Sequence, residues 1–264
     1  MLPPMRNFKE TLINILKNLG LFERAVIIKY LMADMSPSHR RHKNEIAEFY
    51  SQFVKRGDLC FDVGANMGTR TEAFLELGAT TLAVEPQDLC IRYLKIKFKN
   101  KSSVLLVQTA CGEEEGKKEI MLNDVLVLSS LSEKWIKSVK DSGRFSHCSW
   151  QGRTLVSVAP LDHLIEKYGK PIFCKIDVEG FEFEVLKGLS QPIKNISFEF
   201  IPEYIDAAIS CIDHLFNIGM TQFNYTIEEK MSFILPHWVG HEEMKKILLS
   251  LPDKSIYGDV YARS

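Results

Sequence analysis

The stretch FDVGANMG, residues 61–68, decides the predicted fold of this chain. Residues 58–63 form a short apolar run that is typical of a buried strand, and residues 69–77 have the apolar spacing of a helix. Two glycines lie between them, and glycine tolerates the backbone angles of a tight turn. We therefore predict a strand, a turn and a helix, and in open α/β sheets such a turn at the carboxyl end of a strand faces the ligand.

The residues of this turn indicate what kind of ligand it meets. A nicotinamide enzyme would carry G-x-G-x-x-G here, whereas this chain has G-x-x-x-G with Asp62 in front of it. The Asp62 carboxylate would repel a diphosphate and would suit an ammonium group, such as that of S-adenosylmethionine. We expect Gly64 to let the backbone approach this ligand and Gly68 to let the helix pack closely on the strand. Asn66 is expected to meet the ligand carboxylate or to stabilise the turn.

Strands and helices alternate along the chain outward from this turn. Apolar runs that predict strands occur, with helical patterns between most of them, at 58–63, 80–86, 103–110, 171–180 and 195–201. Two further strands are predicted at 220–227 and 255–263, and this final pair can run antiparallel. We predict an α/β fold with a seven-stranded, doubly wound, Rossmann-like sheet and right-handed crossovers.

Two segments interrupt this alternation. Residues 1–45 are predicted to be an N-terminal helical extension, and the main domain is assigned to residues 46–264. A helix is expected over residues 44–54, where apolar side chains recur at helical spacing. Residues 111–160 form a long irregular insertion with a hairpin around Gly116, and such insertions commonly act as lids or substrate loops.

The composition limits the partners and the compartment. The chain of 264 residues has 33 Lys and Arg against 34 Asp and Glu, and its net charge of -1 gives no electrostatic reason to expect a nucleic acid partner. Six scattered cysteines without a C-x-x-C pair argue against zinc and for buried, reduced thiols in a cytoplasmic protein. No signal peptide or transmembrane segment is predicted, because charged residues interrupt the apolar segment 11–31. Contact of that segment with a membrane surface stays open.

Two later strand ends complete the predicted cofactor site. Glu85 ends the second strand, where an acidic side chain accepts hydrogen bonds from ribose hydroxyls. After the third strand, Gln108, Thr109 and Ala110 occupy the expected place of the adenine contacts. The alternative interpretation of these residues is that they are ordinary loop and surface positions.

A second acidic motif, KIDVEGFE at residues 175–182, follows another predicted strand. Asp177 ends that strand, Glu179 lies in the turn after it, and Glu182 opens the next helix, where the helix dipole already favours an acid. The carboxyl ends of parallel strands meet at one edge of a sheet. We therefore expect Asp177 to face the first glycine turn across the ligand cleft, although more than 100 residues separate them.

The pairing of the two motifs resembles the FkbM-type S-adenosylmethionine-dependent methyltransferases. The resemblance covers about residues 57–200 and rests on GDLCFDVGANMGTRT, LAVEPQ and PIFCKIDVEGFEFEVLKGL. It implies a class I methyltransferase fold and O-methylation of hydroxyl groups on sugars, polyketides or other small molecules. It also implies that the turn at 62–68 holds the cofactor, that Glu85 contacts its ribose, and that Asp177, Glu179 and Glu182 lie near the reaction centre.

The chemistry of methyl transfer assigns roles to these acids. An acceptor oxygen must lie about 3–3.5 Å from the sulfonium carbon, and a hydroxyl must lose its proton as the new bond forms. We predict that Asp177 is the base or orients the acceptor, with Glu179 beside it, and that their charges raise the pKa of one of the two carboxyls. The same pair can instead hold Mg²⁺ together with Glu199, but nothing in the spacing demands a metal, so the metal-free interpretation is preferred.

Other functions stay open at this point. The chain can be a methyltransferase for a protein or an RNA, although it lacks an excess of basic residues and the NPPY-like tetrad used on flipped bases. It can also be a non-catalytic protein that binds S-adenosylmethionine. The basic stretch around His39 and His42 is expected to be solvated rather than to bind an anionic substrate.

Overall fold

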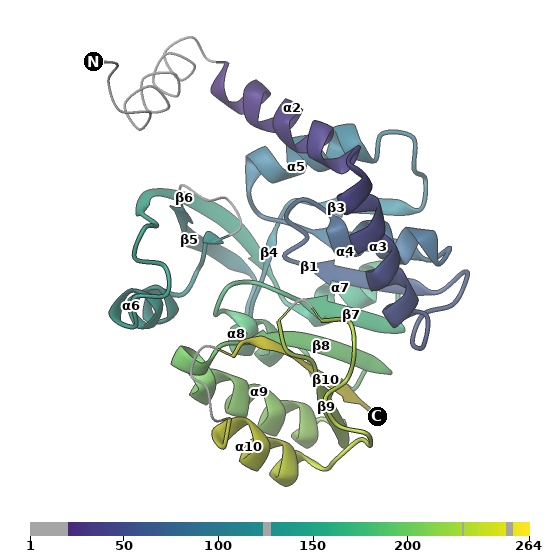
Figure 1. Ribbon diagram of the computed structural model, residues 1–264, viewed down its shortest axis with the longest axis vertical. Helices are drawn as coiled ribbons and strands as arrows, with labels where there is room; N and C mark the ends of the chain where they lie inside the picture. The colour runs from purple at the N-terminus through teal and green to yellow at the C-terminus, as the bar shows by residue number, and fades with distance from the viewer. Residues whose placement is uncertain (1–20, 124–127, 229, 252–255) are drawn as a thin grey trace.

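A computed structural model describes residues 21–123, 128–228, 230–251 and 256–264 (Figure 1). Within these ranges the chain forms a seven-stranded sheet in the order β3-β2-β1-β7-β8-β10-β9. The strands are β1 (Leu59–Val63), β2 (Thr80–Val84), β3 (Val104–Val107), β7 (Phe173–Ile176), β8 (Asn195–Phe200), β9 (Gln222–Tyr225) and β10 (Gly258–Arg263). All neighbours are parallel except β10, which is antiparallel to both β8 and β9. The predicted doubly wound sheet is confirmed, and it has the class I methyltransferase arrangement that the resemblance implies.

The register of the central strands brings both sequence motifs to one edge of the sheet. In β1, Asp62 pairs with Ala83 of β2, and Val63 pairs with Ile176 of β7. Both motifs therefore follow the carboxyl ends of neighbouring strands, and these ends lie side by side in the sheet. Because β1 and β7 are covered on both faces, their side chains are buried without the polar alternation of a half-exposed strand.

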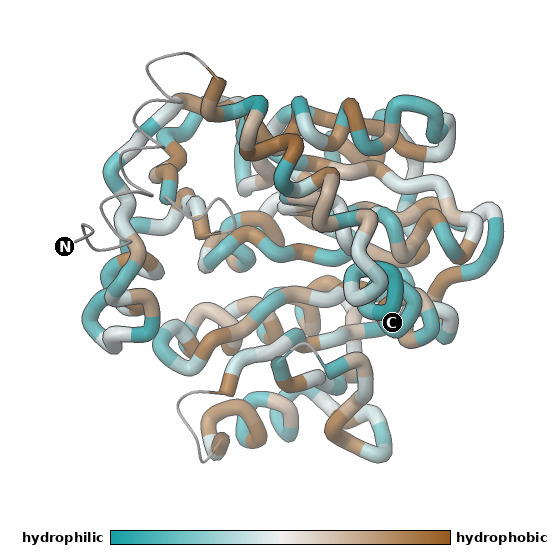
Figure 2. Tube along the Cα trace, turned by 45° about the horizontal axis from the view of Figure 1, so that its top comes forward, coloured by the Kyte–Doolittle hydropathy of each residue, from teal (hydrophilic) through white to brown (hydrophobic). Residues whose placement is uncertain are grey.

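Two layers of helices cover the sheet. One layer contains α2 (Phe22–Asp34), α3 (Pro37–Tyr50), α4 (Thr69–Glu76) and α5 (Asp88–Lys97), and the other contains α7 (Leu161–Tyr168), α8 (Glu182–Lys187), α9 (Ile205–Asn217) and α10 (His241–Leu249). Buried side chains of α3 and α4 pack with Phe173 of β7. Those of α7, α8 and α9 pack with Phe61 and Phe198 on the opposite face. Hydrophobic and hydrophilic residues alternate along these helices (Figure 2), as helices that cover a sheet require.

The insertion carries a second, three-stranded sheet in the order β4-β6-β5. Its strands are β4 (Ala110–Cys111), β5 (Gly116–Asn123) and β6 (Trp150–Ala159), and helix α6 (Glu133–Asp141) lies between β5 and β6 in the chain. The predicted hairpin around Gly116 is wrong, because β4 and β5 do not pair with each other. Both pair with β6 instead, β4 in parallel and β5 antiparallel.

The helix predicted over 44–54 begins and ends earlier than expected. Helix α3 starts at Pro37, because the Ser36 hydroxyl accepts a hydrogen bond from the His39 amide at 3.1 Å and proline suits the first helical turn. It ends at Tyr50, so the predicted domain boundary at residue 45 falls inside this helix. The predicted helical extension is described only from residue 21 onward, and its earlier part lies outside the described residues.

The cysteines are free thiols, as predicted, and all except Cys148 are buried. Burial raises the pKa of Cys111 to about 12, which keeps this thiol protonated and unreactive. No helix among the described residues is both long enough and apolar enough to cross a membrane.

Candidate active site

The turn after β1 is held by backbone contacts to both neighbouring strands. The amides of Gly64 and Ala65 donate to the Val84 carbonyl at 2.9 and 3.0 Å. Gly64 has a φ of +83°, and a Cβ atom at this position would lie 1.8 Å from the carbonyl oxygen of Asp177. The contact with the Asp177 loop therefore requires glycine here. The predicted reason was close approach of a ligand, so this contact is an additional reason.

The other two turn residues also adopt the left-handed conformation. Gly68 has a φ of +73°, and a Cβ atom added here would lie 2.8 Å from Leu94 of α5 and 2.9 Å from Phe98, which caps that helix. This glycine therefore makes room for α5, whereas the prediction was close packing of the next helix on β1. Asn66 has a φ of +46°, and its amide donates to the Glu85 carboxylate at 2.9 Å. Its side-chain Oδ1 is buried without a hydrogen-bond partner among the described residues.

Asp62 is buried at the start of this turn, with 2% of its surface exposed. The Thr71 hydroxyl donates to its carboxylate at 2.5 Å. Burial raises the pKa of Asp62, while the Thr71 hydrogen bond and the positive charge of Arg70 lower it. An ammonium group next to this carboxylate would favour its ionised form, which agrees with the role predicted for Asp62.

Glu85 is fixed directly after β2 by two backbone amides. Asn66 donates to one carboxylate oxygen at 2.9 Å, and Gln87 donates to the other at 2.8 Å. Burial raises the pKa of Glu85 to about 7, against the effect of these two hydrogen bonds. The Gln87 side chain also hydrogen-bonds this carboxylate, which leaves it acceptor capacity for the predicted contact with a ribose hydroxyl.

A narrow cavity of about 40 Å³ lies between these strand ends and the insertion. Thr109 and Ala110 line it, whereas Gln108 is exposed and is not among the lining residues. Ile120 and Leu131 of the insertion close its other side. The predicted adenine contacts therefore reach this cavity through Thr109 and Ala110 and not through Gln108.

Three carboxylates converge at the ends of β7 and β8. Asp177, Glu179 and Glu199 each place one oxygen within 4.8 Å of the others. Glu179 has a φ of +55°, and the Ser130 hydroxyl donates to its carbonyl at 2.6 Å, so the insertion helps to hold this turn. Burial, followed by the charge of Asp177, raises the pKa of both Glu179 and Glu199. The expectation that close carboxylates raise one pKa is thus confirmed, with Glu199 affected as well as Glu179.

The second motif also carries a buried lysine that was not among the predicted site residues. Lys175 is fully buried and lies 2.6 Å from the Asp259 carboxylate and 3.3 Å from that of Asp177. Although burial lowers its pKa, the charges of Asp177 and Asp259 raise it above the usual value. The signal was present, because a lysine inside an otherwise apolar strand requires a buried counter-ion.

Glu182 supports the acidic turn from within. Its carboxylate accepts hydrogen bonds from the amides of Val178 at 3.1 Å and Gly180 at 3.2 Å. Burial raises its pKa to about 7. Since both amides belong to the turn that carries Glu179, Glu182 positions that turn.

A larger cavity of about 490 Å³ adjoins the narrow one. Gly64, Asn66, Asp177 and Glu179 line both, so the two motifs share a wall between the cavities. Helices α2 and α3 also line the larger cavity. Helix α2 contributes Tyr30, Ala33 and Asp34, and α3 contributes His39 and His42.

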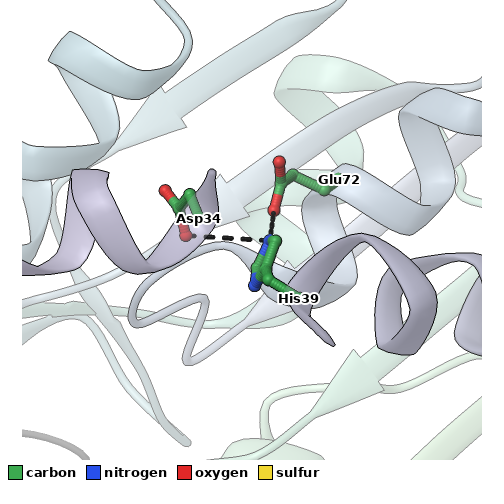
Figure 3. A group of neighbouring side chains, drawn as sticks. All are labelled: Asp34, His39 and Glu72. Atoms are coloured by element: carbon green, nitrogen blue, oxygen red, sulfur yellow. Dashed lines mark hydrogen bonds and ion pairs between the residues drawn. The ribbon is translucent and has the colours of Figure 1, made fainter. Parts of the chain in front are cut away.

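An ion-pair network fixes these two helices beside the cofactor turn (Figure 3). His39 lies 2.8 Å from the Glu72 carboxylate and 3.7 Å from that of Asp34, so its predicted solvation is wrong. Lys97 lies 2.8 Å from Glu72 and 3.3 Å from Asp34, and it donates to the Met67 carbonyl at 2.9 Å. His39, Asp34 and Glu72 are spaced as metal ligands would be, but both carboxylates already pair with the Lys97 ammonium.

Three comparisons relate the chain to known proteins. The family model of the methyltransferase FkbM domain matches residues 62–248. The hexuronic acid methyltransferase AglP of Haloferax volcanii is 23% identical over 164 residues, which are 61% of this chain and span 62% of that relative's length. Similar solved structures are a TehB-like SAM-dependent methyltransferase from Corynebacterium glutamicum (10% identity, TM-score 0.44, covering 83% of this chain and 88% of that one) and precorrin-6y C5,15-methyltransferase from Geobacter metallireducens (11% identity, TM-score 0.40, covering 83% and 88%). Because the matched family region contains both motifs and most of the chain, the protein belongs to the FkbM methyltransferase family.

Proposed function

We propose that this protein transfers the methyl group of S-adenosylmethionine to a hydroxyl group of a sugar or another small molecule. The observation that carries the proposal is the shared wall of the two cavities. Gly64 and Asn66 from the cofactor turn and Asp177 and Glu179 from the acidic turn line both of them. A donor bound by the first turn would therefore face an acceptor held by the second.

Residues that line the two cavities suit the separate parts of the donor. Asp62, on the larger cavity, offers a carboxylate to the ammonium group, and Asn66, whose side-chain oxygen has no partner among the described residues, lines both cavities. Glu85 is oriented for the ribose hydroxyls by its two backbone hydrogen bonds. Thr109 and Ala110 lie where the adenine ring is expected.

The acids divide the work on the acceptor between them. As the acceptor oxygen bonds to the methyl carbon, the carbon–sulfur bond breaks, its electron pair returns to sulfur, and the hydroxyl proton must leave. Glu179 takes that proton, because its raised pKa makes it a stronger base than an ordinary carboxylate. Asp177, paired with Lys175 at 3.3 Å, stays in place and orients the hydroxyl.

The acceptor class is supported by the relative and by the cavity. AglP is named for methylation of a hexuronic acid, a sugar derivative, and its 23% identity to this chain extends over 164 residues. The larger cavity, at about 490 Å³, has the size of a small-molecule site and a polar lining that includes Tyr30 and His42. A sugar hydroxyl would find hydrogen-bond partners there.

A metal-assisted reaction is the second candidate, because Asp177, Glu179 and Glu199 converge closely enough to share one cation. Carboxylates are the ligands that Mg²⁺ prefers, and a divalent ion would offset their mutual repulsion. The same residues would then bind the metal and the acceptor rather than remove the proton.

The proposal is tested in two steps with the full chain. Calorimetry must first detect binding of S-adenosylmethionine, and then labelled methyl transfer is followed on a panel of neutral and acidic glycosides. Glu179→Gln should lower kcat by about 10²- to 10⁴-fold with donor binding unchanged. Glu119→Gln, an exposed acid paired with Arg153, is the matched control and should act normally. Absence of S-adenosylmethionine binding would refute the proposed donor. A near-normal kcat in Glu179→Gln would refute the role of Glu179 as the base.

A further inference from the structure

Helix α2 presents an apolar stripe to the outside of the molecule. Leu21, directly before the helix, and Ile28, Met32 and Met35 are 40%, 56%, 68% and 82% exposed. They follow one another at intervals of seven, four and three residues, which places them on one face of a helix. Isolated exposed apolar residues are common, but four on one helical face form a continuous surface.

The opposite face of α2 is already used within the protein. Ile27 is buried in a cluster with side chains of α5, and Tyr30 lines the larger cavity. Both acids of the helix pair with cations of α5 on this side, although Glu23 is itself exposed. Glu23 pairs with Arg92 at 2.8 Å, and Asp34 pairs with Lys97 at 3.3 Å.

The two cations of α2 lie on the outer side instead. Arg24 and Lys29 are exposed, and at about 100° per residue they fall on the two flanks of the stripe formed by Ile28 and Met32. The acidic side chains of α2 therefore pair with α5, whereas its two cations lie beside the exposed apolar face. Figure 1 shows that α2 lies at the periphery of the molecule, beyond α5.

The whole segment that contains this helix is positively charged. Residues 1–45 contain eight Lys and Arg against four Asp and Glu, a net charge of +4, whereas the remainder of the chain carries -5. This asymmetry is hidden in the nearly neutral total. It gives the exposed stripe a preference for a negatively charged surface.

We propose that α2 docks this protein on an anionic lipid surface. The apolar stripe would enter the boundary between headgroups and acyl chains, while the stems of Arg24 and Lys29 extend to lipid phosphates. A second copy of the chain fits less well, because a two-fold interface over this stripe would bring the same cations of both copies together. The charge pattern therefore favours a membrane over self-association.

Vesicle sedimentation with the full chain tests the proposal. We expect binding to vesicles of equal parts phosphatidylcholine and phosphatidylglycerol, weak binding to phosphatidylcholine alone, and release at high salt. Arg24→Glu and Lys29→Glu should each weaken partitioning at least about fivefold. The double variant Ile28→Asp/Met32→Asp should weaken it more than about tenfold. Leu249→Asp is the matched control, since Leu249 is 62% exposed on α10 at the far end of the molecule and should bind normally.

Other outcomes overturn the proposal and identify what covers the stripe. A concentration-dependent dimer without vesicle binding would assign the stripe to a second copy. A monomer without vesicle binding would refute the docking of α2 on lipid. Equal loss of binding in Leu249→Asp and in the α2 variant would show that partitioning does not depend on α2. Calorimetry with S-adenosylmethionine confirms that each variant is folded, because none of these positions lines either cavity.

Discussion

Replacing Gly64 by alanine should destabilise the protein for two reasons, the positive φ of this residue and the clash of the new Cβ atom with the Asp177 carbonyl oxygen. With a φ of +83°, any side chain at this position costs about 1–2 kcal/mol. The new Cβ would in addition start 1.8 Å from the Asp177 carbonyl oxygen and must reach at least 3.0 Å. Overpacking of this kind costs about 1–3 kcal/mol, so Gly64→Ala should lower the free energy of unfolding by about 2–5 kcal/mol.

Gly57→Ala is the matched control for this change. Gly57 has a φ of +88° but no atom within 4 Å of its would-be Cβ, so it should lose only the conformational part, about 1–2 kcal/mol. Urea denaturation of both variants measures the difference. Because the clash displaces Asp177 by an ångström or so, kcat/KM of Gly64→Ala should also fall about a hundredfold, while Gly57→Ala stays active. Equal losses in the two variants would refute the reasoning.

Three further predictions follow from the buried charges. Lys175→Met should lower the free energy of unfolding by about 3–5 kcal/mol, because it removes the buried ammonium that pairs with both Asp177 and Asp259. The surface variant Lys187→Met should lose at most about 1 kcal/mol in the same urea titration, and similar losses would count against the buried network. Turnover should not change with EDTA or added Mg²⁺, and a loss that Mg²⁺ restores would reassign the acids to a metal. Finally, the pKa values of about 7 for Glu85 and Glu182 exceed the ordinary 4.5, so the folded state binds more protons than the unfolded state. Stability should therefore fall as the pH rises from about 4.5 to about 7, by up to about 3 kcal/mol per group, and urea titrations that show no fall between about pH 5 and pH 8 would contradict this.

The sheet was predictable because each of its strands carries a local signal. The apolar runs at 58–63 and 171–180 end in an acid and glycine, and a parallel sheet then places those ends side by side. The helix start at Pro37 has a local signal too, since Ser36 followed by proline is typical of a helix N-terminus, but the basic residues after it have the composition of a solvated stretch. The prediction of solvation therefore missed the role of His39 in holding α2 and α3.

The remaining features depend on pairings that no local pattern contains. Strand β6 separates β4 from β5 by pairing Val158 with both Ala110 and Gly116, so the apparent hairpin was misread. In the same way, the demand for glycine at Gly64 arises from Asp177, which is distant in the chain. Such contacts are set by the three-dimensional register, and the sequence around each residue is compatible with several of them.

The ion pair between Lys175 and Asp259 also sets an order of events during synthesis. Asp259 lies on β10, which is inserted between β8 and β9 although it follows both of them in the chain. Lys175 meets Asp177 two residues later in the chain, but its second carboxylate partner, Asp259, is made only with β10. A nascent chain that has completed β7 and β8 therefore contains only part of this ion-pair network, and the network is complete only after β10 has inserted between β8 and β9.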